Sequence, residues 1–344
     1  MNYNLESKTV NIIRILQILW EHSDVEHRLT QDKIIEYLYN EYNIEMERKA
    51  VSRALKNLQL LFDSEQDLPI EIFLPEKSGE KDGNISNGAY MIRLFDDSEL
   101  KLIIDSVLAS RHINAKYSDN LVKRLCCLSN KYFLSHVKYT TEETDLVKSN
   151  NKCLFDNIDI ISEAIAKGKQ ITFDYNNYGA DKKLYKTSSQ IVSPYRFILR
   201  NQHYFLITFD EKHQSKGNYR VDKMTNVKVA PDNATPFKEV YGGQNLLTYT
   251  KMLTTYPYMF TDEPKKVEFL TDKGMLGEVF DYFGTSTDIT EQPDGKYKVS
   301  VYTSPMAMEI WALKYLTSVE ILSPQSLRDI VKEDIKGATA KYKI

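Results

Sequence analysis

Apolar residues follow a helical spacing through most of the first 167 residues and change to an alternating spacing at about residue 170. In the first part they recur every three or four positions, apart from one alternating stretch at 69–95. From Ile171 to Tyr175 apolar residues alternate with polar ones, as in a half-buried strand. With 344 residues, of which 42% are hydrophobic, the chain can form two or three separate cores. The pattern predicts an α+β protein of several domains.

Residues 1–95 are predicted to hold three helices and a β-hairpin. The helices are Lys8–His22, a segment that starts at Leu29-Thr30-Gln31-Asp32 and runs to Tyr42, and Glu47–Phe62. Two alternating strands follow, on either side of a polar loop. Their apolar positions are Ile70, Ile72 and Leu74 in one strand and Tyr90, Ile92 and Leu94 in the other. Three helices before a hairpin are typical of a winged helix-turn-helix domain, which binds DNA.

The third helix is basic on the side that faces away from its apolar residues. Val51, Leu55 and Leu58 form the apolar face, and segment 48–56 holds four positive charges and no acid. A recognition helix needs this arrangement, because one face packs on the domain while the other meets phosphates and bases. A solvated helix face is the alternative. Lys77 and Lys81 in the hairpin loop are predicted either to contact phosphate or simply to be solvated. The predicted DNA contacts are Arg48, Lys49, Ser52, Arg53 and Lys56.

The rest of the chain divides into three predicted segments. Residues 96–150 form a helical linker with helices at about 98–111 and 118–133, followed by a polar stretch. Residues 151–233 hold a short helix and then five or six short strands, which suggest a small β-barrel. After Ile171–Tyr175, the predicted strands are Lys186–Val192, Phe197–Leu199, His203–Phe209, Tyr219–Lys223 and Val227–Ala230. Residues 234–344 follow the order βαββαβ with a final helix, which is the ferredoxin-like pattern.

Four motifs in the strand-rich segment resemble the WYL domain. They are Phe173-Asp174-Tyr175, Ser193-Pro194-Tyr195-Arg196, Asn201-Gln202-His203-Tyr204-Phe205-Leu206 and Tyr219-Arg220-Val221-Asp222-Lys223-Met224. The Trp-Tyr-Leu run that names the family reads Tyr204-Phe205-Leu206 here, and its Arg-x-Asp-Arg motif ends in Lys223. The whole chain is similar to bacterial WYL-type transcription regulators, whose C-terminal extension carries a tryptophan and a late Ser-Pro-x-x-Leu segment. Trp311 and Ser323–Leu327 fit these two features.

The resemblance implies an Sm-like or SH3-like barrel that binds a nucleic-acid or nucleotide-like effector. Alternation along 203–209 puts Phe205, Ile207 and Phe209 in the core and Tyr204 on the other face. Aromatic and basic residues together suit base stacking and phosphate binding. The alternative is that Arg220 and Asp222 form a structural ion pair and that Tyr204 is a packing residue. The candidate effector residues are Ser193, Tyr204, Arg220 and Lys223, followed by Arg196, His203 and Tyr175.

These observations together predict a cytoplasmic transcription regulator that binds an operator as a homodimer. The alternative is a general single-stranded DNA- or RNA-binding protein without an operator. A net charge of −3 argues against a protein coated in nucleic acid but allows local basic patches. No catalytic motif, no zinc spacing among the six histidines and three cysteines, and no long apolar stretch are present in the sequence. We therefore expect no enzyme activity, no cofactor, no metal and no membrane span.

Overall fold

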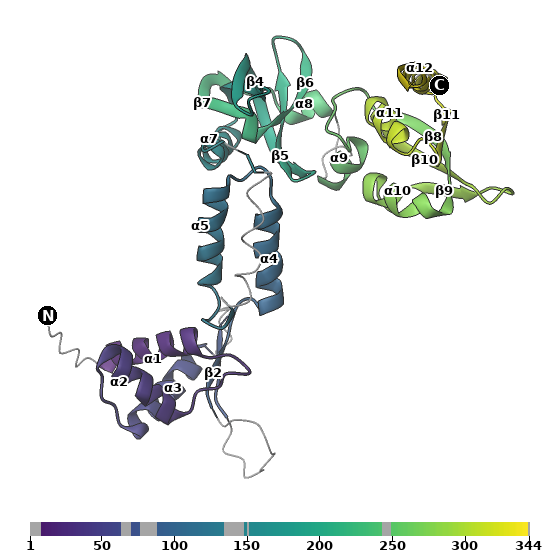
Figure 1. Ribbon diagram of the computed structural model, residues 1–344. Coiled ribbons are helices and arrows are strands. Elements are labelled where there is room, and N and C mark those ends of the chain that lie inside the picture. Colours follow the sequence, from purple (N-terminus) through teal and green to yellow (C-terminus); the bar gives the residue numbers. More distant parts are fainter. Residues whose placement is uncertain are drawn as a thin grey trace. The chain divides into compact units, whose positions relative to one another are not determined.

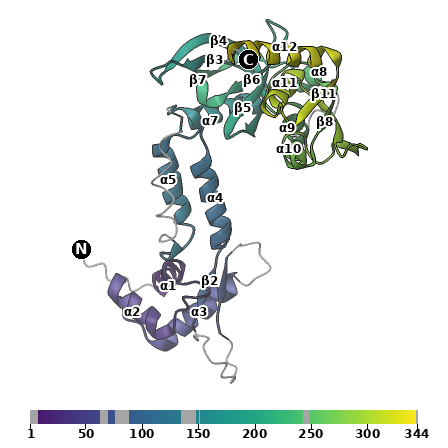
Figure 2. The same ribbon diagram turned by 45° about the vertical axis from the view of Figure 1, so that its right-hand side comes forward.

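The computed structural model describes residues 8–62, 70–75, 88–133, 148–149, 151–242 and 249–342 (Figures 1 and 2). It is a mixed α/β structure, with helices in the N-terminal part and two larger antiparallel sheets in the C-terminal part. Contacts within the chain define two compact units, Met1–Lys148 and Ser149–Ile344. No helix in the described part of the chain is long and apolar enough to cross a membrane.

Three helices at the start of the first unit share one core. They are α1 (Lys8–His22), α2 (Gln31–Tyr42) and α3 (Arg48–Phe62), all within two residues of their predicted bounds. The hydroxyl of Thr30 accepts the backbone N–H of Lys33 at 3.2 Å and so caps α2, which begins within the predicted start. The core residues are Ile15, Ile18 and Leu19 of α1, Ile34 and Leu38 of α2, and Val51, Ala54, Leu55 and Leu58 of α3.

The predicted hairpin is present, but part of its expected apolar face was wrong. Strands β1 (Glu71–Phe73) and β2 (Tyr90–Ile92) pair antiparallel, with Ile72 opposite Met91. Met91 is 1% exposed, whereas Ile92 is 42% exposed. Met91 faces the core because it lies opposite the buried Ile72, and the buried Ser23 hydroxyl accepts its backbone N–H at 3.1 Å. The loop with Lys77 and Lys81 lies outside the described residues.

Two helices of the linker run side by side (Figures 1 and 2). Helix α4 (Asp97–Ala109) begins with a capping box between Asp96 and Glu99. Helix α5 (Ala115–Cys126) begins before the predicted residue 118, because Asn114 caps its start, and it ends well before residue 133, because the chain turns after Cys126. The buried residues between the helices are Leu100, Ile104, Leu108, Val122, Cys126 and Phe133.

Partly buried polar contacts tie the end of α1 to the end of β2 and to the segment that follows α5. Arg93 donates to the carbonyl oxygens of Trp20 and Ser23 at 2.5 and 2.7 Å, and burial lowers the pKa of its guanidinium. Asn130 Nδ2 donates to Asp24 Oδ2 at 2.6 Å. No sequence motif predicts these contacts, because the two partners of each contact lie about 70 to 106 residues apart in the chain.

A five-stranded antiparallel sheet begins the second unit, preceded by helix α7 (Leu154–Ala166). Its order is β6-β5-β4-β3-β7, and no pairing in the described chain joins β6 to β7, so the sheet is not a closed barrel. Two predicted strands merge into one long β4, whose register shifts between Pro194 and Arg196. The predicted strand over 219–223 was wrong in part, since β6 ends at Arg220 and a 3-10 turn follows at Val221–Lys223. The strands are β3 (Lys169–Tyr178), β4 (Leu184–Arg200), β5 (His203–Asp210), β6 (Ser215–Arg220) and β7 (Met224–Asn233).

A four-stranded antiparallel sheet with order β11-β8-β10-β9 ends the second unit. Two short helices, α8 (Phe237–Tyr241) and α9 (Tyr249–Thr255), precede it. Its core packs around the fully buried Trp311, whose ring meets that of Phe269 at 5.3 Å. The elements follow in the predicted order: β8 (Lys265–Thr271), α10 (Leu276–Phe283), β9 (Asp288–Glu291), β10 (Tyr297–Thr303), α11 (Pro305–Lys314), β11 (Val319–Ser323) and α12 (Gln325–Tyr342).

Candidate functional site

Helix α3 carries a stripe of exposed cations opposite its buried face. Lys49, Arg53 and Lys56 are spaced by four and three residues, so they lie along one side of the helix. All three are exposed, and their side chains make no hydrogen bond or ion pair with any residue that the structure describes. We call these three residues the α3 cationic stripe. Among the described residues, therefore, no contact has to break before these charges can meet a ligand.

The other two predicted DNA contacts on α3 differ from the stripe. Arg48 Nε donates to Gln31 Oε1 at 3.1 Å and lies 3.7 Å from Asp32 Oδ1. This exposed pair ties the start of α3 to the start of α2, and exposed pairs contribute little to stability. Ser52 is half-buried, one turn before Lys56. Arg48 can therefore exchange its contact for a phosphate at small cost.

Two further residues, which were not predicted as DNA contacts, continue the α3 cationic stripe. Asn57 lies four residues after Arg53, and Leu60 lies four residues after Lys56. Both are exposed. An amide suits recognition of adenine, and an apolar side chain suits the thymine methyl group. The same helical spacing that identified the cations would have identified both.

In the five-stranded sheet, Arg220 forms a two-point ion pair with a buried carboxylate. Its Nε and Nη2 donate to Asp222 Oδ1 and Oδ2 at 3.0 and 2.6 Å. The Asp222 side chain is 1% exposed, and that of Arg220 is 24% exposed. Asn151 Nδ2 donates to the carbonyl oxygens of Asp222 and Met224, both at 2.9 Å, and so holds the backbone of this turn in place. The structural ion pair between Arg220 and Asp222, which the sequence analysis gave as an alternative, is therefore present.

A second cation lies beside this ion pair. Lys223 Nζ donates to Asn177 Oδ1 at 3.0 Å. Burial lowers the pKa of Lys223, the charge of Arg220 lowers it further, and Asp222 acts in the opposite direction. The Tyr175 hydroxyl accepts the Arg220 backbone N–H, and burial raises the pKa of that hydroxyl. Only Arg220 pairs with Asp222, and Lys223 makes no ion pair with a described carboxylate, an arrangement that favours an added anion.

Tyr204 lies on the opposite face of β5 from Arg220. Phe205 is directly opposite Arg220 in the ladder, and neighbouring residues of a strand point to opposite faces. The Tyr204 ring stacks on Phe197 at 5.1 Å. The predicted burial of β5 was wrong in part, because Leu206 and Ile207 are both fully buried and Phe205 is only half-buried. This strand is covered on both faces in its middle, so alternation does not mark its core.

The remaining candidates occupy other places in the second unit. Ser193 is fully buried, donates to Glu211 Oε1 and accepts the Thr235 backbone N–H at 2.8 Å. The Arg196 guanidinium lies 5.4 Å from the Phe237 ring centre. His203 is half-buried at the start of β5. Of the seven candidates, the structure brings together Arg220, Lys223 and Tyr175.

The helix and five strands that hold these residues correspond to a known domain. Residues 156–229 match the family model of the WYL domain, from α7 into β7. Residues 156–229 therefore form a WYL domain, as the resemblance of their motifs implied. A search of curated proteins found no match.

A comparison with solved structures matched proteins that include two of low sequence identity and low TM-score. Proteasome accessory factor B/C (PafBC) of Arthrobacter aurescens is 15% identical, with a TM-score of 0.29 over 98% of this chain and 49% of that one. A CRISPR Cas-related protein is 13% identical, with a TM-score of 0.37 over 100% of this chain and 88% of that one. The chain thus spans about half the length of the PafBC structure.

Proposed function

We propose that the chain is a DNA-binding transcription regulator whose WYL domain senses an effector. The observation that carries this proposal is the α3 cationic stripe. Lys49, Arg53 and Lys56 are exposed, unpaired among the described residues and opposite the core, in a chain that also holds a WYL domain. Exposed unpaired cations on one helix face suit the phosphates and base edges of a DNA groove. In this proposal 1–95 is a winged helix-turn-helix domain and 96–150 is a helical linker.

The proposal extends to the architecture of the second unit. We assign 151–233 to an effector-sensing domain with an Sm-like or SH3-like strand arrangement, open between β6 and β7. We assign 234–344 to a ferredoxin-like extension. Numbered within that extension, its strands lie in the order 4-1-3-2 and all neighbours are antiparallel, which supports the assignment.

A binding selection tests the proposal even though the operator sequence is unknown. The full chain is incubated with a random double-stranded DNA library, and the enriched sequences are then footprinted. A regulator is expected to enrich and protect one inverted repeat, because two recognition helices related by two-fold symmetry read two half-sites. Enrichment of no sequence, together with stronger binding to single strands, would instead support the general single-strand binder.

Dimerisation is expected because one recognition helix contacts only a few base pairs. Exposed apolar residues on α11 and α12, Met306, Ile310 and Ile330, offer surface for a two-fold contact. Light scattering on the full chain at micromolar concentration is expected to give twice the chain mass of 40.0 kDa. A mass near 40.0 kDa at the concentration that saturates the operator would contradict the dimer.

The Arg220–Lys223 pair is our proposed anchor for an anionic group of a nucleic-acid or nucleotide-like effector. Lys223→Ala is expected to weaken effector binding by about 1.5–3 kcal/mol, the strength of a charge-assisted hydrogen bond. The probe is a labelled single-stranded oligonucleotide, with nucleoside phosphates as competitors, followed by fluorescence anisotropy. Lys228→Ala removes the same charge from an exposed position on β7 and should leave binding unchanged. Equal affinities of the two variants would remove Lys223 from the site.

The effector would act by shifting the population of dimer states. A ligand changes DNA affinity only to the extent that it binds one of the two states more tightly. Its influence must therefore be reciprocal, so operator DNA should change effector affinity by the same factor. This equality can be measured in the same anisotropy experiment with and without operator.

A further inference from the structure

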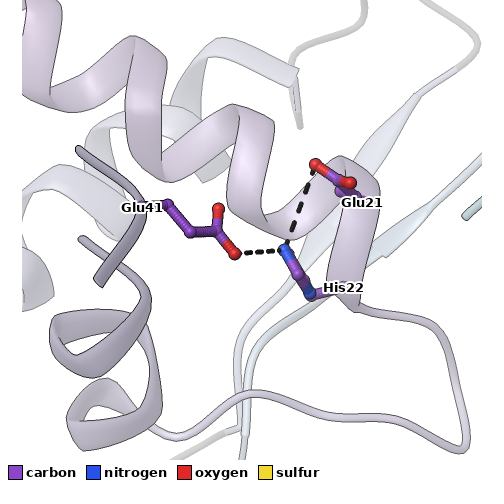
Figure 3. Close-up of side chains that lie close together, drawn as sticks. All are labelled: Glu21, His22 and Glu41. Carbon is purple, nitrogen blue, oxygen red and sulfur yellow. Dashed lines mark ion pairs between the residues drawn. The ribbon is translucent and has the colours of Figure 1, made fainter. Parts of the chain in front are cut away.

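A compact cluster of side chains that could ligate a metal ion lies at the ends of α1 and α2 in the first unit (Figure 3). Glu21 and His22 lie in the last turn of α1, and Glu41 lies in the last turn of α2. His22 Nε2 is 2.9 Å from Glu41 Oε1 and 4.0 Å from Glu21 Oε2. One potential ligand atom from each residue lies within 4.8 Å of the other two. Two helix ends thus present one imidazole and two carboxylates to the same point.

The His22 ring is buried, and its Nε2 is aimed between the two carboxylates (Figure 3). The residue is 5% exposed, and its ring stacks on Tyr37 with 4.1 Å between centres. Although Glu41 Oε1 is close, Nε2 makes no hydrogen bond with any described residue, so the oxygen lies off the direction of the ring nitrogen. This geometry is expected when both atoms point at a common ion, because each is then directed at the ion and not at the other ligand atom. A buried nitrogen without a hydrogen bond normally needs another partner.

We propose that Glu21, His22 and Glu41 form a binding site for a divalent transition-metal ion of the zinc type. Imidazole nitrogen and carboxylate oxygen are ligands of such ions, at about 2.0–2.2 Å. A tetrahedral ion at those distances separates its ligand atoms by roughly 3.4 Å, between the two Nε2–O distances given above. Two carboxylates neutralise the dication. Glu21 is more than half exposed, which leaves the ion a path from solvent and room for water ligands.

Lys131 opposes this ion through the other nitrogen of the ring. Its Nζ lies 2.8 Å from His22 Nδ1, and an ammonium group only donates hydrogen bonds. While that bond persists, the proton of the neutral imidazole is on Nε2, where it blocks the metal. A metal on Nε2 requires the proton to move to Nδ1, which ends the bond with Lys131. Metal binding and the His22–Lys131 contact are therefore mutually exclusive.

This exclusion connects the metal site to the arrangement of the first unit. Lys131 belongs to the segment that follows α5, and its backbone N–H also bonds the Glu21 carbonyl at 3.1 Å. Binding of the ion would break the side-chain contact between α1 and that segment. It would form a new link between α1 and α2 through the ion. The proposed DNA-binding helices would thereby be linked to each other and partly released from the linker.

Titration of the full chain with Co²⁺, followed by visible absorption, and with Zn²⁺, followed by calorimetry, tests the proposal. We expect one ion per chain, and binding at least tenfold weaker in His22→Ala. Lys131→Gln is expected to bind about tenfold more tightly, because the amide oxygen accepts the Nδ1 proton as outer partners of metal-bound histidines do. Lys131→Arg keeps a donor and should bind no more tightly than the natural chain. His27→Ala, an exposed histidine outside the cluster, should bind as the natural chain does.

Glu41→Gln serves as a second variant in case His22→Ala does not fold, since Glu41 is partly exposed and glutamine keeps its shape. It is also expected to weaken binding at least tenfold, and Zn²⁺ should raise the melting temperature of the natural chain but not of this variant. Three results would overturn the proposal. They are no binding at millimolar ion, equal binding by Glu41→Gln and the natural chain, and no tightening in Lys131→Gln.

Discussion

Arg220→Ala is expected to lower the free energy of unfolding of the second unit by about 3 kcal/mol. The change leaves the carboxylate of Asp222 buried without its counter-charge, since its side chain is 1% exposed. Breaking a buried pair from one side costs about 3–5 kcal/mol, and the partial exposure of Arg220 puts this pair at the lower end. The measurement is urea unfolding followed by fluorescence. A Trp20→Phe background leaves Trp311, in the second unit, as the reporter.

The matched control also removes the charge of Asp222, which Arg220→Ala alone leaves buried without a partner. Arg220→Ala combined with Asp222→Asn is expected to recover at least half of the lost stability, because no buried charge then lacks a partner. Lys223→Ala should cost less than Arg220→Ala, since it leaves no buried charge behind. If Arg220→Ala unfolds at the same urea concentration as the natural chain, the ion pair contributes nothing to the fold.

The expected difference between Arg220 and Lys223 decides how the effector site should be probed. An effector defect in Arg220→Ala is ambiguous, because the turn at Val221–Lys223 is disturbed together with the charge. An effector defect in Lys223→Ala reports on the charge alone. Loss of effector response in both variants, with instability in Arg220→Ala only, is the outcome that our assignment requires.

The helices of the first unit could be predicted because local information determines them. Each of α1, α2 and α3 buries one face, so the spacing of apolar residues marks both the helix and its core. The prediction of the buried face of the hairpin was wrong at Met91, because Met91 and Ile92 are neighbouring apolar residues and alternation cannot show which of them is buried. The prediction of burial along β5 was wrong in part for a related reason, since a strand that is buried on both faces shows no alternation of apolar and polar residues.

The candidate site shows the same division between local and distant information. The α3 cationic stripe needs only the period of one helix, and the prediction that it faces away from the core is confirmed. The effector candidates depend on strand register, which places Tyr204 and Arg220 on opposite faces of β5. The burial of Ser193 depends on Glu211 and Thr235, at 18 and 42 residues along the chain. Sequence motifs identified these residues but could not say which of them meet.

The largest expected effect is the loss of DNA binding when the α3 cationic stripe is removed. The triple variant Lys49→Ala, Arg53→Ala and Lys56→Ala is expected to lose at least about 3 kcal/mol of operator affinity, or roughly a hundredfold. Each cation that leaves a phosphate should also reduce the slope of log affinity against log salt by about 0.9. Stability should be unchanged, because these side chains are exposed and have no partner among the described residues.

A charge-matched control separates the stripe from the net charge of the protein. Replacing Lys152, Lys212 and Lys228, all exposed in the second unit, removes the same three charges and should leave affinity and salt slope nearly intact. Single variants then show which residues of the stripe contact phosphate and which contact a base. A residue that contacts only phosphate weakens binding to every sequence equally, whereas one that reads a base edge relaxes the preference at one operator position. Equal operator affinity of the triple variant and its control would place the DNA surface elsewhere than on α3.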